Sequence, residues 1–208
     1  DTHLGEGGAK TKFRYNIAAL KLLAELEADG RSSTPTEQEV LSRYVGLGGL
    51  PQAFDPDNKQ WEKEYAELSA LLTPEEYESA RASTLNAHYT SPVVISAMYE
   101  TRERLGGKDG NILEPACGVG NFFGLLPDSM KSAKLYGVEL DSVTGRIAKQ
   151  LYPDADIQIK GFEKTDTPDA FFDVAIGNVP FGSYKVADKR YDKHNFLIHD
   201  YFFAKTLD

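Results

Sequence analysis

The stretch that most constrains this chain is Ile112-Leu113-Glu114-Pro115-Ala116-Cys117-Gly118-Val119-Gly120-Asn121. A short apolar run leads into an acid and a proline, and two glycines spaced one residue apart precede the start of a helix. This order predicts a first parallel strand that turns into a first helix, because glycine allows a tight turn and a close approach to a ligand. Phe123 stands where a dinucleotide G-x-G-x-x-G fingerprint has its third glycine, so the stretch departs from that pattern.

Four apolar runs after residue 110 predict strands, at 112–113, 135–138, 157–159 and 171–176. Helical patterns lie between and after them, at about 120–126, 142–151 and 195–207, and Ser91 with Pro92 predicts a further helix start before them. Alternation of this kind indicates a parallel sheet with right-handed crossovers. An open sheet of this class binds its ligand at the carboxyl ends of the strands.

The first third of the chain reads as helical, and we expect an N-terminal extension over residues 1–86. Apolar residues at helical spacing predict a helix over 13–29. Thr34-Pro35-Thr36-Glu37 predicts a capped helix start, with Glu37 reaching back to Thr34. Trp61 is expected on a third helix, and Thr73 is expected to cap a fourth.

Composition limits the classes of protein that fit. The 208 residues are 41% apolar and carry a formal net charge of −9, which disfavours a free-standing, non-specific nucleic-acid binder. Cys117 is the only cysteine, so an internal disulfide is excluded. His88, His194 and His199 form no metal-ligand pattern with it, and no metal is expected. With no apolar run of membrane-spanning length and no signal peptide, we expect a soluble cytoplasmic protein without a membrane partner.

Glu139 ends the second expected strand and lies 19 residues after Gly120. A carboxylate at this place can accept hydrogen bonds from both hydroxyls of a ribose, so we expect a ligand with an adenosine-like end. Asp141 is assigned instead to capping the next helix.

Asn178-Val179-Pro180-Phe181 follows the fourth expected strand. An asparagine, a backbone carbonyl, a proline and an aromatic ring thus stand where a second substrate meets the ligand. A nicotinamide enzyme has no particular use for this set, whereas an enzyme that methylates an amino group does.

Taken together, these motifs resemble those of the amino-group DNA methyltransferases, above all the N6-adenine branch, over about residues 86 to 205. Glu114–Gly120 is similar to that family's D-P-A-C-G-x-G signature, and Asn178–Phe181 to its N-P-P-Y/F tetrapeptide. His88-Tyr89-Thr90-Ser91-Pro92 resembles the Y-T-P element that closes over the methionine end of the cofactor. The helical lead, with Gly46-Leu47-Gly48-Gly49, also resembles methylase segments of large helicase-containing proteins of mobile elements.

The resemblance implies a Rossmann-like S-adenosylmethionine-dependent methyltransferase sheet over residues 87–208, with DNA as partner and a helicase region in the same full-length protein. The implied activity is methylation of adenine N6 on a base flipped out of the duplex. The expected catalytic residues are Asn178, Val179, Pro180 and Phe181. The expected cofactor contacts are Tyr89, Thr90, Glu114, Pro115, Ala116, Gly118, Gly120, Glu139, Phe162 and Glu163.

Departures from the family pattern leave alternatives open. Val179 replaces the first proline of the tetrapeptide and Phe181 lacks a hydroxyl group, so a catalytically weak module that serves as a scaffold in a DNA-processing protein is the alternative. The tetrapeptide does not separate adenine from cytosine, or DNA from RNA or protein glutamine. Lys185, Lys189, Arg190 and Lys193 form the most basic stretch, either a solvated loop or a phosphate contact.

Four strands are fewer than this family usually has, since its sheets continue beyond the fourth. We expect the order third, second, first, fourth, which leaves an apolar fourth strand at an edge, where strands tend to associate. The sequence therefore predicts a sheet that is incomplete at its C-terminus. It also predicts a chain that is inactive alone and that pairs through this edge or covers it with the N-terminal helices.

Overall fold

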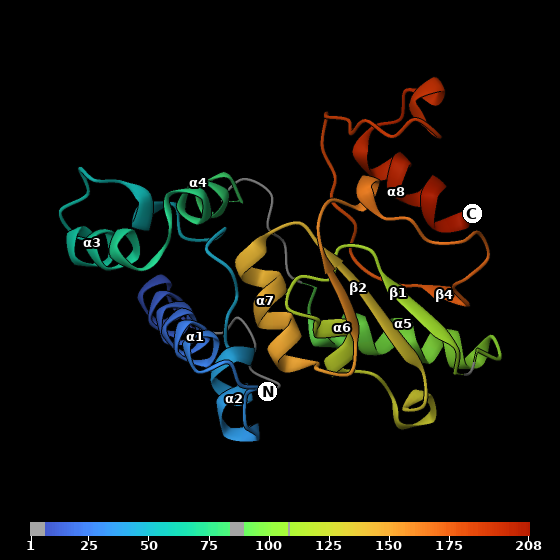
Figure 1. Ribbon diagram of the computed structural model, residues 1–208, viewed down its shortest axis with the longest axis horizontal. Coiled ribbons are helices and arrows are strands. Elements are labelled where there is room, and N and C mark those ends of the chain that lie inside the picture. The colour runs from blue at the N-terminus through green and yellow to red at the C-terminus, as the bar shows by residue number, and fades with distance from the viewer. Residues whose placement is uncertain (1–6, 84–89, 108) are drawn as a thin grey trace. The chain divides into compact units, whose positions relative to one another are not determined.

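The computed structural model describes residues 7–83, 90–107 and 109–208 (Figure 1). The chain divides into two compact units, each with its own core. One consists of Asp1–Tyr89 together with Arg146–Leu151, and the other of Thr90–Gly145 and Tyr152–Asp208. In the described parts of the chain, no helix is long and apolar enough to cross a membrane.

The first unit is helical, as its sequence pattern predicts. Its helices are α1 (Ala9–Asp29), α2 (Pro35–Ser42), α3 (Glu62–Leu71) and α4 (Pro74–Ser83), with a 3₁₀ turn at Pro51–Phe54. The predicted capping box is present, because Thr34 accepts from the Glu37 amide while the Glu37 carboxylate accepts from the Thr34 amide. Trp61 lies at the cap position of α3, one residue before the helix, and meets Phe13 edge to face.

Asn16 organises the core of the helical unit. Its side chain is fully buried on α1, where it donates to the Gly46 carbonyl at 2.6 Å and accepts from the Val45 amide at 2.9 Å. The glycine-rich segment after α2 is non-helical and needs such partners, because a buried backbone group without a hydrogen bond is costly. One side chain on α1 thereby fixes the course of the chain at Val45 and Gly46.

The second unit is an α/β layer structure. Its strands β1 (Asn111–Glu114), β2 (Lys134–Glu139), β3 (Asp156–Ile159) and β4 (Val174–Ala175) are parallel and lie in the order β3-β2-β1-β4. This is the order that the sequence predicts. The helices of this part are α5 (Pro92–Arg104), α6 (Asn121–Gly124) and α8 (Ile198–Leu207), and α7 (Ser142–Leu151) joins β2 to β3.

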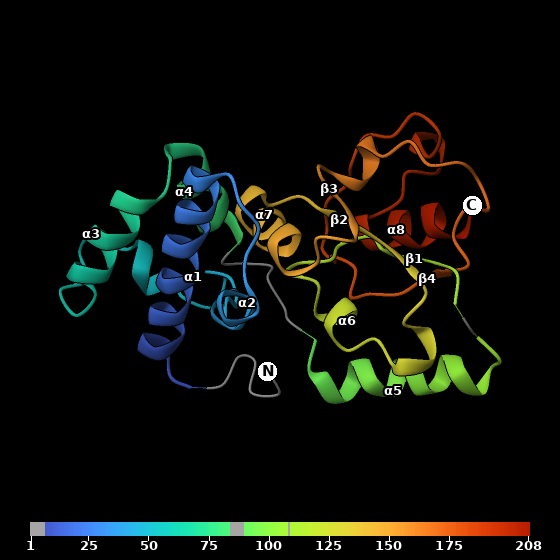
Figure 2. The ribbon, with the colours of Figure 1, turned by 60° about the horizontal axis from the view of Figure 1, so that its bottom comes forward.

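Alternate residues of the strands pack into two separate hydrophobic cores. Ile112 of β1 packs with Tyr99 of α5 and Phe122 of α6, whereas Leu113 packs with Tyr201 and Phe202 of α8. This alternation follows from the period of two in a strand. Figure 2 accordingly shows α5 and α6 on one face of the sheet and α8 on the other. A sheet covered on both faces is typical of parallel α/β folds.

The fourth strand is shorter than expected. The sequence predicts a strand over 171–176, but only Val174 and Ala175 pair with β1. Phe171 and Phe172 instead form an edge-to-face cluster with Tyr136 of β2, and Ala170 just before them adopts a left-handed conformation with φ of 54°. Aromatic packing on the face of the sheet thus replaces strand pairing here.

Helix α5 begins as predicted, with Ser91 at the cap position and Pro92 at the first position, although the Ser91 side chain makes no capping hydrogen bond. Two other helix boundaries differ from the sequence prediction. The predicted helix over 120–126 is confined to Asn121–Gly124. The predicted helix from 195 begins at Ile198, because Asn195 is left-handed with φ of 57° and cannot continue a right-handed helix.

Replacing Asn16 with alanine leaves the Val45 amide and the Gly46 carbonyl without partners. We expect the free energy of unfolding of the helical unit to fall by about 2–4 kcal/mol. Trp61 is the only tryptophan and is buried in this unit, so its fluorescence during urea denaturation reports the unit selectively. The control is Asn58→Ala, which removes a hydrogen bond to the Gln60 amide outside the core and should cost under about 1 kcal/mol. Equal midpoints for the two variants would contradict the role of Asn16.

Candidate functional site

The candidate site lies where the four parallel strands end. Glu114 ends β1 and Glu139 ends β2, and the turn that begins at Gly161 follows β3. Asn178 comes three residues after β4. Because carboxyl ends of parallel strands share one edge of a sheet, the predicted glycine, acidic and asparagine motifs meet at the same edge.

The turn after β1 depends on two glycines in the left-handed region. Gly118 has φ of 56° and Gly120 has φ of 84°, values that other residues adopt only with strain. A Cβ on Gly120 would also stand 2.5 Å from the Tyr152 ring. The Cys117 amide donates to the Val138 carbonyl at 2.9 Å, which ties the turn to β2. Cys117 is buried, and burial raises the pKa of its thiol, so it acts as a small core residue.

Glu139 joins this turn to the end of β2. Its carboxylate accepts from the Gly118 amide and from the Asp141 amide, each at 2.8 Å. Burial raises the pKa of Glu139, while the Asp141 and Gly118 amides oppose that rise. Each carboxylate oxygen has a second lone pair, so Glu139 can still accept from two hydroxyl groups of a ligand. Asp141 caps α7, as predicted, by accepting from the amide and hydroxyl of Thr144.

Glu114 is the most deeply buried acid of the site, with 2% of its surface exposed. Its Oε2 atom is buried and accepts no hydrogen bond from the described residues. Burial raises its pKa well above the ordinary value, and the negative charge of Glu139 adds to the rise. A buried polar atom without a partner is rare in proteins and is one mark of a site that receives a ligand.

The turn after β3 places Phe162 and Glu163 differently. Phe162 is buried in the core beside Tyr201 and Phe202 of α8, so its ring packs inside the protein. Glu163 is half-buried, and its carboxylate lies over Gly161, where a Cβ would stand 2.2 Å from Oε1. Glu163 thus lies over the backbone of the turn, whereas Phe162 supports the turn from beneath.

The tetrapeptide after β4 presents its residues to different surroundings. Asn178 is exposed, and Phe181 has 56% of its surface exposed. Val179 and Pro180 are half-buried, and Val179 packs against the core beneath α8. The tetrapeptide is thus held at its centre while an amide and an aromatic ring at its two ends reach solvent.

The remaining predicted cofactor residues lie close to these turns or outside the described residues. Pro115 is buried directly after β1, and Ala116 packs against the core beneath α8. Thr90 is half-buried two residues before α5. Tyr89, like His88, lies outside the described residues. Within the described ranges, no group of three His, Cys, Asp or Glu side chains is arranged to hold a metal ion.

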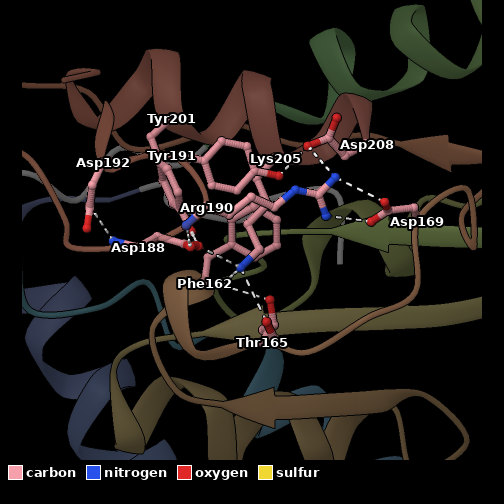
Figure 3. Close-up of polar contacts among 10 residues, drawn as sticks. All are labelled: Phe162, Thr165, Asp169, Asp188, Arg190, Tyr191, Asp192, Tyr201, Lys205 and Asp208. Atoms are coloured by element: carbon pink, nitrogen blue, oxygen red, sulfur yellow. Dashed lines mark hydrogen bonds and ion pairs between the residues drawn. The ribbon is translucent and has the colours of Figure 1, made fainter. Parts of the chain in front are cut away.

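A polar cluster behind the site was not predicted from the sequence. Lys205 of α8 donates to the carbonyls of Phe162 and Thr165, and it pairs with Asp188 at 3.2 Å (Figure 3). The Tyr201 hydroxyl, one helical turn earlier, donates to the same carboxylate at 2.7 Å. These contacts fasten the turn after β3 and the loop after the tetrapeptide to one helix. The only sequence signal was the spacing of Tyr201 and Lys205, which places them on one helix face.

Replacing Glu114 with glutamine should stabilise the α/β unit at neutral pH. A carboxyl group with a raised pKa binds a proton more readily when folded, so its contribution to stability is lost as pH rises above the unfolded value of about 4.3. We expect Glu114→Gln to raise Tm by a few degrees at pH 7.5, since about 1 kcal/mol shifts Tm by about 2–4 °C at this size. The gain should shrink toward pH 4.5.

Scanning calorimetry across this pH range measures the effect. The control is Glu100→Gln on α5, whose side chain is exposed and should change Tm by under about 1 °C. A lower Tm for Glu114→Gln at pH 7.5 would contradict the cost assigned to the buried carboxyl group.

Comparisons with known proteins give two distant relatives in sequence. The chain is 28% identical over 209 residues to the defense against restriction protein B of Escherichia phage P1, an alignment that covers 98% of this chain. It is 37% identical over 71 residues, or 34% of this chain, to the type II methyltransferase M.CvrRI of Paramecium bursaria Chlorella virus XZ-6E. The matched regions span 8% and 18% of the lengths of those proteins. No protein-family model matches the chain.

The comparisons also match two solved structures, each of a protein described as a methyltransferase. One is a putative class I S-adenosylmethionine-dependent methyltransferase from Listeria monocytogenes, with a TM-score of 0.46 and 16% identity over 94% of this chain and 68% of that one. Another is the plantazolicin methyltransferase BpumL with SAH, with a TM-score of 0.35 and 15% identity over 66% of this chain and 48% of that one. The chain itself has an α/β fold with a four-stranded parallel sheet, and it is distantly similar in sequence to a type II methyltransferase.

Proposed function

We propose that this chain binds S-adenosylmethionine and belongs to an enzyme that methylates adenine N6 in DNA. The observation that carries the proposal is one edge of the sheet, at which Glu139 is bound to the glycine turn, Glu114 Oε2 has no hydrogen-bond partner among the described residues, and the Asn178–Phe181 segment follows β4. An acidic, glycine-rich edge of the sheet suits a cationic nucleoside, and an exposed amide with an exposed ring suits a planar amine.

The cofactor side of the site fits S-adenosylmethionine by its donor set. Glu139 keeps lone pairs for two ribose hydroxyls, and the Gly118–Gly120 turn allows close approach of the backbone. Glu114 would accept from the ammonium end of the ligand and thereby gain a partner for Oε2. Glu163 would reach the adenine amine, and Thr90 with Tyr89 would close over the methionine end. Bound S-adenosylmethionine supplies an electrophilic methyl group on a sulfonium.

The chemistry of the methyl acceptor accounts for the residue types of the tetrapeptide Asn178–Phe181. The exocyclic amine of adenine is a weak nucleophile because its lone pair is delocalised into the ring. Hydrogen bonds from this amine to the Asn178 side-chain oxygen and the Val179 carbonyl would favour a pyramidal nitrogen with a localised lone pair. Phe181, which is exposed, would stack on the extruded base. Catalysis would then come mainly from positioning and preorganised dipoles.

The proposal that DNA is the substrate rests on the names of the relatives. One is named for defence against restriction and the other as a type II methyltransferase, and both terms concern methylation or cleavage of DNA. Because the matched region spans 8% of the phage protein, we propose that this chain works within a longer protein that also carries other DNA-processing parts, a helicase region among them.

Glu139→Ala should weaken S-adenosylmethionine binding by about 1–3 kcal/mol, the cost of leaving buried hydrogen-bonding groups unpaired. Titration calorimetry at pH 7.5 measures the affinity. Glu139→Gln keeps one oxygen acceptor and the shape of the side chain, so it should show a smaller loss. Equal affinity for the alanine variant and the unmodified chain would exclude the ribose contact.

Asn178→Ala should lower methyl transfer to DNA by about 100-fold or more while cofactor affinity stays unchanged, because the side-chain oxygen acts on the acceptor amine. Asn178→Asp retains an acceptor oxygen at the same place and should keep more activity than the alanine variant. The measurement is transfer of a radiolabelled methyl group to adenine by the longer protein that contains this chain, read as N6-methyladenine after the DNA is digested to nucleosides.

Two results would decide against this proposal. Wild-type turnover by Asn178→Ala would exclude the catalytic role of Asn178. Tight cofactor binding without transfer to adenine by the longer protein that contains this chain would favour the alternative, a non-catalytic module, for which Val179 in place of a stiff proline is the supporting observation.

A further inference from the structure

The loop after the tetrapeptide, residues 183–195, gathers exposed cationic side chains in an acidic protein. Lys185, Lys189 and Lys193 are all exposed, although the whole chain has a formal net charge of −9. Lys185 donates to Asn195 at 2.5 Å across the loop. Acidic side chains within the loop would offset the positive charge of these lysines if they also faced solvent. The positions of Asp188 and Asp192 therefore decide the net charge of the loop's exposed face.

The central acid of the loop is turned inward. Asp188 has 13% of its side chain exposed and is bound by Tyr201 and Lys205 of α8 (Figure 3). Burial raises the pKa of Asp188, but hydrogen bonds from the Tyr201 hydroxyl and the Arg190 amide, together with Lys205, lower it by more. The pKa of Asp188 is therefore lowered overall, and the group stays ionised. Its charge is therefore neutralised by a residue from outside the loop.

Arg190 is the loop cation that turns away from the lysines. Its guanidinium binds Asp169 with two hydrogen bonds and pairs with Asp208 (Figure 3). Asp192 remains exposed and accepts from the Asp188 amide at 2.8 Å. The outward face of the loop thus carries three lysines against one aspartate.

Aromatic rings interleave with these lysines. Phe181 and Tyr184 are 56% and 44% exposed. The Tyr184 ring lies over Gly182, where a Cβ would stand 2.9 Å from two ring carbons. His194 is exposed and stacks on Phe196 with ring centroids 5.1 Å apart. Exposed rings between lysines are the arrangement by which proteins hold a single nucleic-acid strand, with phosphates on the cations and bases on the rings.

We infer that the loop 183–195 is a DNA-contacting surface, which holds the strand next to the extruded base through Lys185, Lys189, Lys193 and Tyr184. The inference rests on the proposed function, because it assigns the strand contact of the same site. Asp188, Tyr201 and Lys205 are positioning residues that turn the acid inward and leave the lysines outward.

The test compares two triple variants with the same change of charge. One replaces Lys185, Lys189 and Lys193 with glutamine, and the control replaces Lys59, Lys134 and Lys149, which are also exposed. Fluorescence anisotropy with labelled single- and double-stranded oligonucleotides between about 50 and 200 mM salt gives affinity and its salt dependence. The loop variant should bind at least about 10-fold more weakly, and its salt slope on duplex should fall by about 2–3, near one per lysine.

A second pair of variants tests the stacking contact. Tyr184→Ala should weaken single-strand binding by about 5-fold or more, with an unchanged salt slope, because a ring and not a charge is lost. Tyr184→Phe keeps the ring and should retain the affinity of the unmodified chain. Equal affinity of the alanine variant and the unmodified chain would remove Tyr184 from the surface.

Three outcomes would overturn the inference. The first is the absence of DNA binding by the unmodified chain at about 50 mM salt. The second is equal affinity and salt slope for the two triple variants. The third is displacement of DNA by poly-L-glutamate more readily than by unlabelled DNA, which would indicate an acidic protein partner.

Calorimetry with S-adenosylmethionine on the same samples separates this inference from the proposed function. Cofactor binding that is equal in both triple variants, together with DNA binding lost only in the loop variant, supports both. Cofactor binding without lysine-dependent DNA binding overturns the surface alone. Lysine-dependent DNA binding by a chain that binds no cofactor supports the surface and contradicts the proposed function.

Discussion

The hydrogen bond from the Gly118 amide to the Glu139 carboxylate is the contact on which the geometry of the site depends. It joins the turn after β1 to the end of β2, two segments that the parallel register brings to one edge of the sheet. Gly118 is left-handed, which turns the chain sharply after this amide, and the Asp141 amide holds the other carboxylate oxygen. The strand order, the turn and the acid therefore specify one arrangement together, which is the consistency expected where a sequence encodes a site.

Helix α8 completes the site from the other face of the sheet. Its apolar residues cover Leu113 and Phe162, while Lys205 binds the carbonyls of Phe162 and Thr165 and also binds Asp188. Lysine is seldom buried this deeply without partners, and here each of its three donors has an acceptor. A single ammonium group thereby couples the turn after β3 to the loop after the tetrapeptide.

The sequence allowed the strand order, the glycine turn and the Thr34 capping box to be predicted, because each depends on local chemistry or on alternation of strands and helices. The predicted length of the fourth strand was wrong, because Phe171 and Phe172 pack on Tyr136 instead of extending β4. An apolar run does not say whether its side chains serve pairing or face packing, since tertiary contacts decide. The same limit hid the burial of Phe162 and the partnership of Asp188 with Lys205, which joins residues 17 positions apart.

Buried carboxyl groups give the site a conflict between stability and binding. Glu114 and Glu139 both have raised pKa values because burial disfavours their charged forms, and their mutual repulsion adds to the cost for Glu114. A fold selected for stability alone would place apolar or amide side chains here. A positively charged ligand would make the ionised forms of Glu114 and Glu139 favourable, because its charge would compensate the negative charge that burial disfavours. Under the proposed function, the reduced stability of the unliganded protein is the cost of preorganising these acids for a cationic cofactor.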